Sequence, residues 1–356
     1  MDKITFGIIG GGWRCEFYLR IAKELPDFFE IRGIVTRSEE KGSRIEKQWG
    51  VKTFRTVEDL LKTHPSFVVV SVPWEAAPVL TKELTDKGIA VLSETPPAPD
   101  LEGLIKLNKI IKKDAKVQVA EQYHLQPFNA ALIDIAKSGR LGRVSQVQLS
   151  VCHGYHAMSL MRKLLDIGFE NAAIRAQKII SPIVNGPDRE IMPKKEEIKE
   201  SYQVIATLDF YEKLCVYDFT GDQYFSYIRS NRILVRGEKG EINGSKVKYL
   251  KNYLTPVEID LKRLNAGENG NLEGLYLKGI LLGNEWIYKN PFIGGRLSDD
   301  EIAIASCLQK MDAYVKGGAS FYSLAEASQD HYLGMMIDKA AAANECITTE
   351  KQSWAD

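Results

Sequence analysis

The sequence has no excess of charge of either sign, few cysteines and few histidines. Lysine plus arginine and aspartate plus glutamate each total 47 residues, so no global field points to nucleic acid or to an anionic membrane. The five cysteines are odd in number and include no Cys-x-x-Cys pair, which predicts reduced thiols in a cytoplasmic protein. With five histidines and no carboxylate cluster beside them, we expect no metal site.

Long apolar runs are also missing from the chain. No segment approaches the roughly 20 residues of a membrane-spanning helix, and the first apolar run enters glycines instead of following a basic segment, so we expect neither a membrane span nor a signal peptide. Hydrophobic residues make up 44% and charged residues 26%, proportions typical of a globular protein. A chain of 356 residues is expected to form two domains.

The chain opens with a strand, a glycine turn and a helix. Residues 4–9 are apolar and β-branched, as in a strand buried on both faces. The spacing Gly10-x-Gly12-x-x-Cys15 then follows the dinucleotide fingerprint G-x-G-x-x-G/A, with a cysteine in the third place. Such a turn aims backbone N–H groups and the positive end of a helix dipole at a pyrophosphate. The alternative is a tight turn without a ligand.

Strands and helices alternate as far as residue 122. This alternation predicts a parallel, doubly wound sheet with right-handed crossovers, which is a Rossmann dinucleotide-binding domain over residues 1–122. After the opening strand, we expect further strands at residues 29–35, 67–72, 89–92 and 117–120.

The pattern changes in residues 123–356. One helix begins at Pro127, and strand-like segments then follow with few helices between them. They predict an α+β substrate-binding domain with an open, largely antiparallel sheet, while the last helices, capped by Ser298 and Ser323, could pack back on the first domain. The expected strands are residues 144–152, 202–210, 214–219, 224–228 and 233–235. Residues 182–200 and 265–275 are expected to be loops, the first without a binding role.

The end of the second strand favours NADP(H) over NAD(H). A carboxylate at this place holds a ribose 2′-hydroxyl, whereas an arginine accommodates a 2′-phosphate. Thr36 and Arg37 end the strand, and no carboxylate occurs before Glu39. We therefore expect Thr36 and Arg37 to bind the adenosine end of NADP(H), with NAD(H) as the alternative. The alternative without a ligand is that Arg37 only begins a solvent-exposed helix.

Further cofactor contacts are expected at the carboxyl edge of the sheet, where ligands bind in open α/β folds. Ser71, Pro73 and Trp74 close one strand there, and Trp13 and Arg14 follow the glycine turn. For Trp74 a place in the core or in an interface is the alternative. For Arg14 it is a solvated arginine.

Several further segments follow the glycine turn in a characteristic order: Ser93-Glu94-Thr95-Pro96-Pro97, Glu121-Gln122-Tyr123 with Pro127, Gly139-x-x-Gly142-x-Val144, His153-Gly154-Tyr155-His156, and Tyr322-Ser323-Leu324-Ala325-Glu326-Ala327 followed by Gln329-Asp330. In this order and with the glycine turn, they resemble the Gfo/Idh/MocA oxidoreductases over nearly the whole chain. The resemblance implies a Rossmann domain, an α/β domain with an open sheet, and hydride transfer at a sugar-like carbon by NAD(P). It also implies a homodimer or homotetramer built through that sheet.

The sequence departs from the family at its catalytic motifs. Thr95 stands where the family usually has the lysine of Glu-Lys-Pro, and a threonine cannot act as an acid near neutral pH. The family motif Asp-x-Gly-x-His-x-x-Asp keeps its histidine as His156, but Cys152 and Ser159 replace both carboxylates. Ala77 occupies the place of another histidine that is frequent in the family.

His156 is the best remaining candidate for the proton transfer that must accompany hydride transfer at an alcohol carbon. Thr95 and Tyr123 are expected to assist it, while Glu94, Thr95 and Gln122 frame the nicotinamide. A structural role is the alternative for each of them. The reserves are His153, Tyr155, His124 and Lys163, and Arg162 with Lys163 would hold an anionic or polyhydroxylated substrate unless they form a salt bridge.

Three functions remain open on these residues. The first is an NAD(P)-dependent oxidoreductase acting on a sugar, a cyclitol or a related small hydroxy or keto compound. The second is a lyase or hydrolase that processes glycosides through transient use of bound NAD(H). The third is a non-catalytic protein that senses a dinucleotide or a sugar, because Thr95, Cys152 and Ser159 all lack the family's proton-transferring groups.

Overall fold

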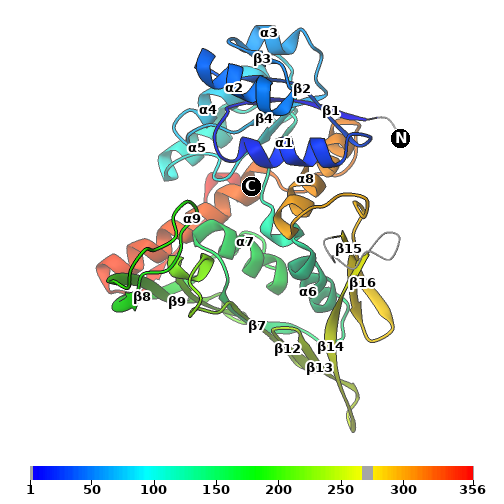
Figure 1. Cartoon of the computed structure of the whole chain (residues 1–356). Coiled ribbons are helices and arrows are strands. Elements are labelled where there is room, and N and C mark those ends of the chain that lie inside the picture. Colours follow the sequence, from blue (N-terminus) through cyan, green and yellow to red (C-terminus); the bar gives the residue numbers. More distant parts are fainter. Residues whose placement is uncertain (1–2, 267–275, 356) are drawn as a thin grey trace.

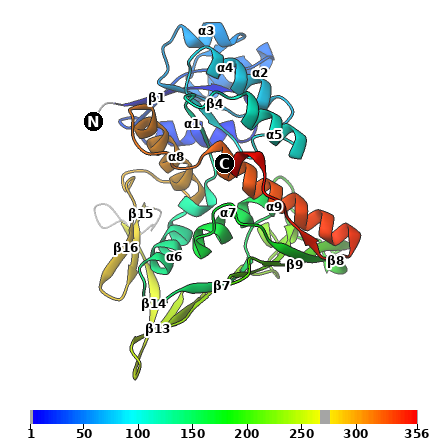
Figure 2. The ribbon, with the colours of Figure 1, turned by 180° about the vertical axis from the view of Figure 1, so that it is seen from behind.

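The computed structural model describes residues 3–266 and 276–355. Figure 1 shows two sheets, one at each end of the molecule, with helices α8 (Asp299–Val315) and α9 (Leu324–Ala343) between them. The view from behind in Figure 2 shows the same arrangement, with the C-terminus at the junction of the two parts. The fold class is therefore α/β, as predicted, while the division at residues 122 and 123 stays a prediction.

The first sheet is parallel, with the strand order β3-β2-β1-β4-β5-β6. Its central strands are buried, except for the half-buried Thr5 of β1, because helices cover both faces, which explains their β-branched composition. The order reverses between β1 and β4, and ligands of open α/β sheets bind at such a reversal point. The strands are β1 (Ile4–Ile9), β2 (Phe29–Val35), β3 (Thr53–Phe54), β4 (Phe67–Val70), β5 (Val91–Ser93) and β6 (Val117–Val119).

Helices α1 to α5 connect these strands, and local capping explains several of their ends. Ser38, Thr56 and Asp100 are the N-caps of α2, α3 and α5, and each side chain accepts a backbone N–H of the first turn. Gly50 ends α2 in the left-handed conformation. The helices are α1 (Cys15–Glu24), α2 (Glu39–Trp49), α3 (Val57–Leu61), α4 (Ala77–Asp86) and α5 (Leu101–Ile110).

The second sheet has eleven strands in the order β16-β15-β14-β13-β12-β11-β7-β10-β9-β8-β17. All neighbours are antiparallel except β7 and β10, which confirms the predicted largely antiparallel sheet. The strands are β7 (Val144–Ser150), β8 (Ala173–Val184), β9 (Ile198–Asp209), β10 (Leu214–Thr220), β11 (Arg232–Gly237), β12 (Gly240–Asn243), β13 (Lys246–Asn252), β14 (Thr255–Ala266), β15 (Tyr276–Leu282), β16 (Glu285–Lys289) and β17 (Ile347–Thr348).

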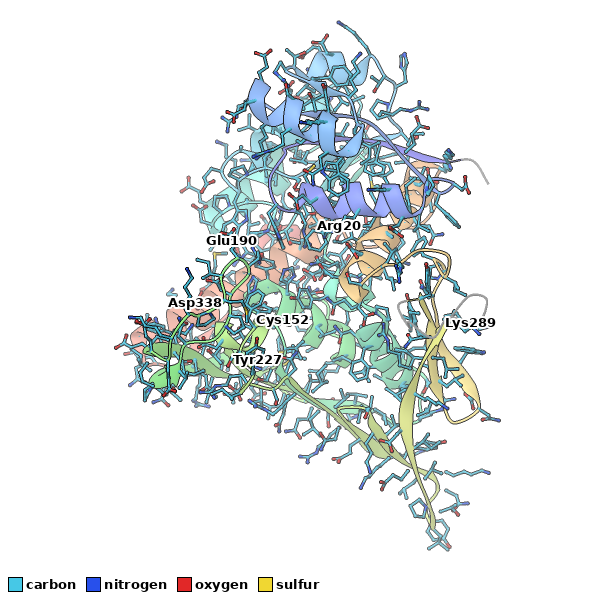
Figure 3. The ribbon with its side chains drawn as sticks, in the orientation of Figure 1. Arg20, Cys152, Glu190, Tyr227, Lys289 and Asp338 are labelled. Carbon is cyan, nitrogen blue, oxygen red and sulfur yellow. The ribbon has the colours of Figure 1, made fainter. Side chains whose placement is uncertain are left out.

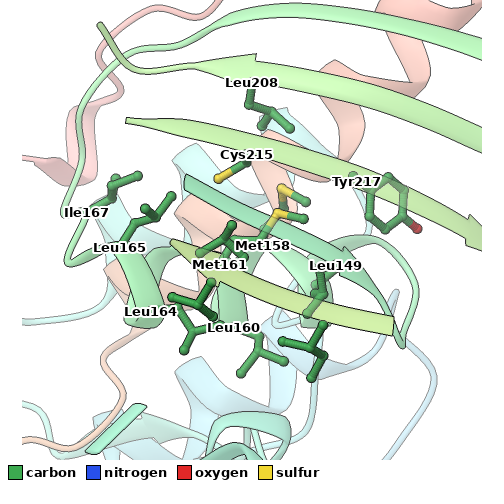
Figure 4. Packing of buried hydrophobic residues seen from close by; sticks show 14 of the residues in the cluster. Leu149, Met158, Leu160, Met161, Leu164, Leu165, Ile167, Leu208, Cys215 and Tyr217 are labelled. Carbon is green, nitrogen blue, oxygen red and sulfur yellow. The ribbon is translucent and has the colours of Figure 1, made fainter. Parts of the chain in front are cut away.

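Helices α6 (Pro127–Lys137), α7 (Gly154–Leu165) and α9 cover one face of this sheet. The main core of the second part lies between α7 and the strands. In Figure 4, Met158 and Met161 of α7 face Cys215 of β10 and Leu208 of β9, and all four are buried. This packing fixes the orientation of α7 and so of the histidines at its start.

Three sequence predictions are wrong in this domain. Residues 224–228 do not form a strand, because a capping box at Thr220 starts the short 3-10 helix η2 (Gly221–Tyr224). Strands β8 and β9 extend into residues 182–200, so that only residues 185–197 connect them. Strands β12 to β16 were not predicted. β14 illustrates why, because it alternates between exposed and half-buried residues and so lacks a strong apolar pattern.

The predicted loop at residues 265–275 is wrong at its first two positions, which belong to β14; the others lie outside the described residues. The two C-terminal helices begin at the predicted caps, since Ser298 and Ser323 each form a capping box with the glutamate three residues later. Ile302 and Leu308 of α8 share a core with Phe6 of β1 and Tyr18 of α1. Helix α8 therefore packs back against the first sheet.

Candidate functional site

A cleft of about 1320 Å³ lies between the two parts of the molecule. Its volume exceeds the several hundred Å³, roughly, of a pocket for one small ligand, so the cleft has room for more than one small molecule. Apart from the reserve candidates, every residue that the sequence predicted for the site lines it; their roles remain predictions. These residues are Gly10, Gly12, Trp13, Arg14, Thr36, Arg37, Ser71, Pro73, Trp74, Glu94, Thr95, Gln122, Tyr123 and His156.

The glycine turn after β1 lies at the centre of the cleft. Gly10 has a φ of +112°, and a Cβ atom there would lie 1.9 Å from the carbonyl oxygen of Ser71, so only glycine fits between the ends of β1 and β4. A Cβ atom on Gly12 would meet no atom within 4 Å. Gly12 therefore leaves free space in front of the first turn of α1, where a pyrophosphate would need it.

Arg14 points into the protein and not into solvent. Its guanidinium donates to Glu94 over 3.3 Å and to Asp300 over 3.2 Å. Burial lowers the pKa of Arg14, but the charges of Glu94 and Asp300 outweigh this effect and raise the pKa above its ordinary value. The other oxygen of Glu94 accepts the Tyr18 hydroxyl at 2.5 Å. The solvated alternative for Arg14 is thus wrong, and its positive charge is already balanced by two carboxylates.

The end of the cleft beside β2 carries three cations. Thr36 is buried at the end of β2, and its carbonyl accepts Arg55 Nη1 at 3.3 Å. Arg37 and Lys41 line the cleft beside it, and neither pairs with a carboxylate among the residues that the structure describes. Sequence reasoning found Arg37 but missed Lys41 and Arg55, which come from α2 and from the residue after β3.

The opposite end of the cleft contains a buried histidine–carboxylate pair. His156 Nδ1 lies 2.6 Å from Glu121 Oε2, and the two residues are only 5% and 2% exposed. The rings of Tyr123 and Tyr155 flank the imidazole, each with its centroid 4.4 Å away. Burial raises the pKa of Glu121 to about 8 and lowers the pKa of His156 to about 3, so the low-dielectric surroundings favour an uncharged pair.

Hydroxyl groups and a second histidine surround this pair. Thr95 lies beside the Tyr155 hydroxyl. The Tyr224 hydroxyl, which follows β10 in the short helix η2, lies 2.7 Å from His153 Nδ1 and accepts the backbone N–H of His153 at 3.1 Å. Burial lowers the pKa of His153 to about 4, so this ring is neutral near pH 7. The end of the cleft thus offers several neutral donors and acceptors.

The remaining reserve residues lie elsewhere. His124 does not line the cleft; its ring stacks on Tyr322, with centroids 4.9 Å apart. Arg162 forms a buried ion pair with Asp330 at 2.6 Å, and Lys163 pairs with Glu326 at 2.6 Å. Both cations line a separate cavity of about 350 Å³. The structure therefore favours the salt-bridge alternative for Arg162 and Lys163.

The connection between β8 and β9 reaches the cofactor end of the cleft. The Arg189 guanidinium lies over the Trp13 ring, 3.8 Å from its centroid, and both residues line the cleft. In Figure 3 the neighbouring Glu190 accordingly lies close to the first part of the molecule. The prediction that this charged segment has no place at a binding site is wrong. Composition alone cannot show that a solvated-looking loop folds over a distant turn.

No group of three or more histidine, cysteine, aspartate or glutamate side chains is placed to hold a metal ion within residues 3–266 and 276–355. Over the same residues, no helix has the length and apolar character needed to cross a membrane.

A glycine turn at the reversal point of a parallel sheet, facing a cleft closed by a second domain, defines a dinucleotide-binding protein of the Rossmann class. Residues 4–123 match the model of the Gfo/Idh/MocA family, which is described as an oxidoreductase family with an NAD-binding Rossmann fold. This match extends over about the first third of the chain and supports the predicted family and enzyme class. No curated protein matches the sequence.

Solved structures are similar over the whole chain. An oxidoreductase from Agrobacterium radiobacter, in complex with NAD+, L-tartaric acid and magnesium, has a TM-score of 0.68 at 14% identity, covering 98% of each chain. The scyllo-inositol dehydrogenase of Lactobacillus casei has a TM-score of 0.65 at 14% identity, again covering 98% of each chain. A levoglucosan dehydrogenase in complex with NADH and levoglucosan has a TM-score of 0.69 at 14% identity, covering 97% of this chain and 99% of its own. At these identities the likeness establishes the fold of both domains.

Proposed function

We propose that this protein is an NAD(P)-dependent oxidoreductase that transfers a hydride between the nicotinamide and a sugar, a cyclitol or a related small hydroxy or keto compound. The observation that carries the proposal is the single cleft that joins the glycine turn to the buried His156. Hydride transfer needs both ends at once, because the dinucleotide must be held at one end and a proton must be moved at the other.

The residues of the cleft fit a nicotinamide dinucleotide. Gly12 leaves the space that a pyrophosphate requires. Gln122 is 2% exposed, and its Oε1 atom is buried without a hydrogen-bond partner within the described part of the chain, although the residue lines the cleft. An acceptor of this kind suits the amide N–H of a carboxamide. The bound dinucleotide would supply the hydride chemistry.

His156 would move the hydroxyl proton of the substrate. Nδ1 is engaged by Glu121, so Nε2 is the nitrogen left for the substrate. Tyr123 and Tyr155 exclude water from both sides of the imidazole and orient it. Thr95, in the position of the family's lysine, can accept or donate a hydrogen bond but holds no exchangeable charge.

The lining of this end favours an uncharged, polyhydroxylated substrate. It consists of neutral groups from Thr95, Tyr123, His153, Tyr155 and Tyr224. The nearby Arg14 is already paired with two carboxylates, so it offers no free charge to an anionic substrate. Tyrosine rings provide apolar contact area with a polar tip, which suits the mixed faces of a sugar or cyclitol.

We propose NADP(H) as the preferred cofactor, with NAD(H) as the alternative. Support comes from Arg37, Lys41 and Arg55 around the end of β2. Among the described residues, the carboxylates that line the cleft are Glu75, Glu94 and Asp300, and none of them belongs to β2 or to the residues directly after it. We expect Arg37→Gln to raise the Kd for NADP(H) about tenfold and to leave the Kd for NAD(H) unchanged, because one charge-assisted contact to the 2′-phosphate is lost. Fluorescence titration with both dinucleotides measures the two constants.

The matched control is Arg44→Gln, which removes an exposed arginine of α2 outside the cleft. We expect no change in either Kd for this control. An equal loss of affinity for NAD(H) and NADP(H) in Arg37→Gln would contradict the assignment of Arg37 to the 2′-phosphate.

Arg189 is expected to help retain the dinucleotide. Its guanidinium lies on Trp13 at the mouth of the cleft, so removing it uncovers the glycine turn. We expect Arg189→Ala to increase the dissociation rate of NADP(H) about five- to tenfold, as expected for the loss of roughly 1 kcal/mol of cation–π and phosphate attraction. Stopped-flow fluorescence measures this rate. Lys194→Ala, in the same segment but outside the cleft, should leave the rate unchanged.

The proposed function is tested by spectroscopy at the nicotinamide absorbance band. The protein should bind NADP(H) by calorimetry and should reduce NADP+ or NAD+ stoichiometrically with one member of a panel of sugars and cyclitols. Absence of binding heat with both dinucleotides would overturn the proposal. Binding without turnover by any panel member would favour the non-catalytic sensor.

Thr95 keeps the glycoside-processing route open as the second candidate. A route that uses bound NAD(H) transiently returns the cofactor to its starting state. Such a route is compatible with the loss of the family's lysine. The two routes differ in what is consumed. Accumulation of reduced nucleotide indicates the dehydrogenase, whereas cleavage of a glycoside without net change in the nucleotide indicates the lyase or hydrolase.

We further propose that the chain forms a homodimer or homotetramer through the second sheet. Helices cover one face of that sheet, and the other carries partly exposed apolar side chains, among them Ile205, Val216 and Leu234. Light scattering after gel filtration tests the assembly. We expect a cytoplasmic location, in keeping with five free cysteines, four of them buried.

A further inference from the structure

The histidine at the end of the cleft has a carboxylate partner that the sequence motif does not contain. The family motif places two carboxylates close to the histidine in the chain, and here Cys152 and Ser159 replace them. We propose that Glu121, which comes from the other domain, takes over their place as the positioning residue of His156 and as the group that balances its charge. This inference rests on the proposed function, since it names how its proton transfer is controlled.

Glu121 is fixed from several sides. It follows the buried strand β6, its Oε2 atom lies 2.6 Å from His156 Nδ1, and its Oε1 atom accepts the backbone N–H of Tyr123 at 3.0 Å. His156 belongs to α7, whose inner face is anchored in the core of the second sheet. The pair therefore joins the two domains at the substrate end of the cleft, and both oxygens of Glu121 are used.

Cys152 and Ser159, which occupy the family's carboxylate positions, cannot position His156 and balance its charge. Ser159 is completely buried, and its hydroxyl has no partner among the described residues. Cys152 is also completely buried, and burial, followed by the charge of Glu121, raises the pKa of its thiol well above the ordinary value. Neither side chain offers His156 a carboxylate. Glu121 is the carboxylate that touches the imidazole.

The pairing determines which nitrogen is free for chemistry. With Glu121 ionised, Nδ1–H donates to it and Nε2 keeps a lone pair toward the substrate. In the oxidation direction the O–H proton then moves to Nε2, the C–H bond loses its hydrogen and electron pair to the nicotinamide, and the C=O double bond forms. The positive charge that develops on the imidazole is offset by Glu121. With Glu121 protonated, its O–H donates to Nδ1 and Nε2–H becomes the proton donor for the reverse reaction.

The titration of the pair predicts opposite pH dependences for the two directions. Burial raises the pKa of Glu121, to about 8, so the pair holds its proton below that pH and loses it above. Oxidation needs the unprotonated pair and should speed up as the pH rises through about 8, whereas reduction should slow down over the same range. The titratable and charged groups that face the pair are Arg14, Glu94, Tyr123, Cys152, His153, Tyr155, Tyr224, Asp300, Cys307, Tyr322 and Asp330.

Glu121→Gln tests the assignment, because it keeps the shape of the side chain and removes its charge. We expect kcat for oxidation to fall about 100-fold while KM and the dinucleotide Kd stay within about twofold, and we expect the rise of the rate near pH 8 to disappear. Glu121→Asp should recover part of the rate. Glu102→Gln, an exposed glutamate of α5 outside the cleft, is the matched control and should behave as wild type. An unchanged kcat and pH profile in Glu121→Gln would overturn the inference.

A second measurement does not depend on turnover or on the folding of that variant. Histidine ¹⁵N spectra of the wild-type protein, with His156 identified by its absence in His156→Asn, should show Nδ1 protonated at high pH and Nε2 protonated at low pH, with the change near pH 8. A tautomer that stays the same through this range would overturn the pairing. A protein that shows the tautomer change but oxidises no substrate keeps the inference and refutes the proposed function instead.

Discussion

Replacing His156 with asparagine should lower kcat for substrate oxidation by about 10²- to 10⁴-fold, the usual contribution of a positioned acid–base group. The dinucleotide Kd should remain within about threefold of wild type, because His156 lies at the substrate end of the cleft and the cofactor is held mainly by the turn after β1. Steady-state kinetics at the nicotinamide absorbance band, with calorimetry for the cofactor, measures both quantities.

The physical reason is the scarcity of other proton acceptors in this end of the cleft. Thr95 holds the place of the family's lysine and has no charge to exchange. Burial raises the pKa of the Tyr155 hydroxyl above its ordinary value, and His153 Nδ1 lies against the Tyr224 hydroxyl and not against a carboxylate. Without His156 this end of the cleft loses the imidazole whose charge the Glu121 carboxylate can balance.

A matched control is available in His64. This residue is exposed, lies outside the cleft and has a φ of 52°, a conformation that asparagine tolerates well. His64→Asn should therefore keep wild-type kinetics. Wild-type turnover in His156→Asn, together with normal cofactor binding, would refute the acid–base assignment.

Gly12→Val should abolish dinucleotide binding, with a Kd at least about 100-fold higher, and turnover should disappear with it. Under the proposed function the pyrophosphate occupies the free space that Gly12 leaves, so two added methyl groups should exclude the ligand from the helix N-terminus. The substituted side chain would meet no protein atom near its Cβ, so the melting temperature should change by no more than about 2 °C. Calorimetric titration and thermal unfolding provide the two readouts.

Gly294→Val is the control for the bulk of the new side chain. Gly294 also has no atom within 4 Å of its Cβ position, and it lies outside the cleft. It should bind the dinucleotide normally. Retained binding in Gly12→Val would show that the turn does not hold the pyrophosphate, whereas a large drop in stability would show that the glycine is needed for folding.

The cofactor end of the site was readable from the sequence because its residues lie close together in the chain or at ends of predictable strands. The fingerprint at Gly10 and Gly12 is one continuous segment, and Thr36 and Ser71 follow strands with strong β-branched patterns. In a parallel sheet the carboxyl ends of all strands meet at one edge, so predicting the strands was enough to bring these residues together.

The residues that sequence reasoning missed come from contacts between distant segments. Glu121 was noted only as part of the family resemblance, although it lies 2.6 Å from His156, 35 residues further along the chain. Arg189 sits in a segment whose composition is that of a solvated loop, yet it stacks on Trp13. Asp300 belongs to none of the motifs found in the sequence, but it pairs with Arg14, from which it is separated by 286 positions in the chain. No local pattern encodes such contacts.

The sequence by itself determined the parallel sheet, its glycine turn and the identity of the surviving histidine, because hydrophobic periodicity and backbone sterics act over a few neighbouring residues. Only the tertiary structure decided which charges meet. It turned Arg14 inward onto Glu94 and Asp300, and it placed the Glu121 carboxyl against His156, since burial makes an unpaired charge costly and forces the partners together.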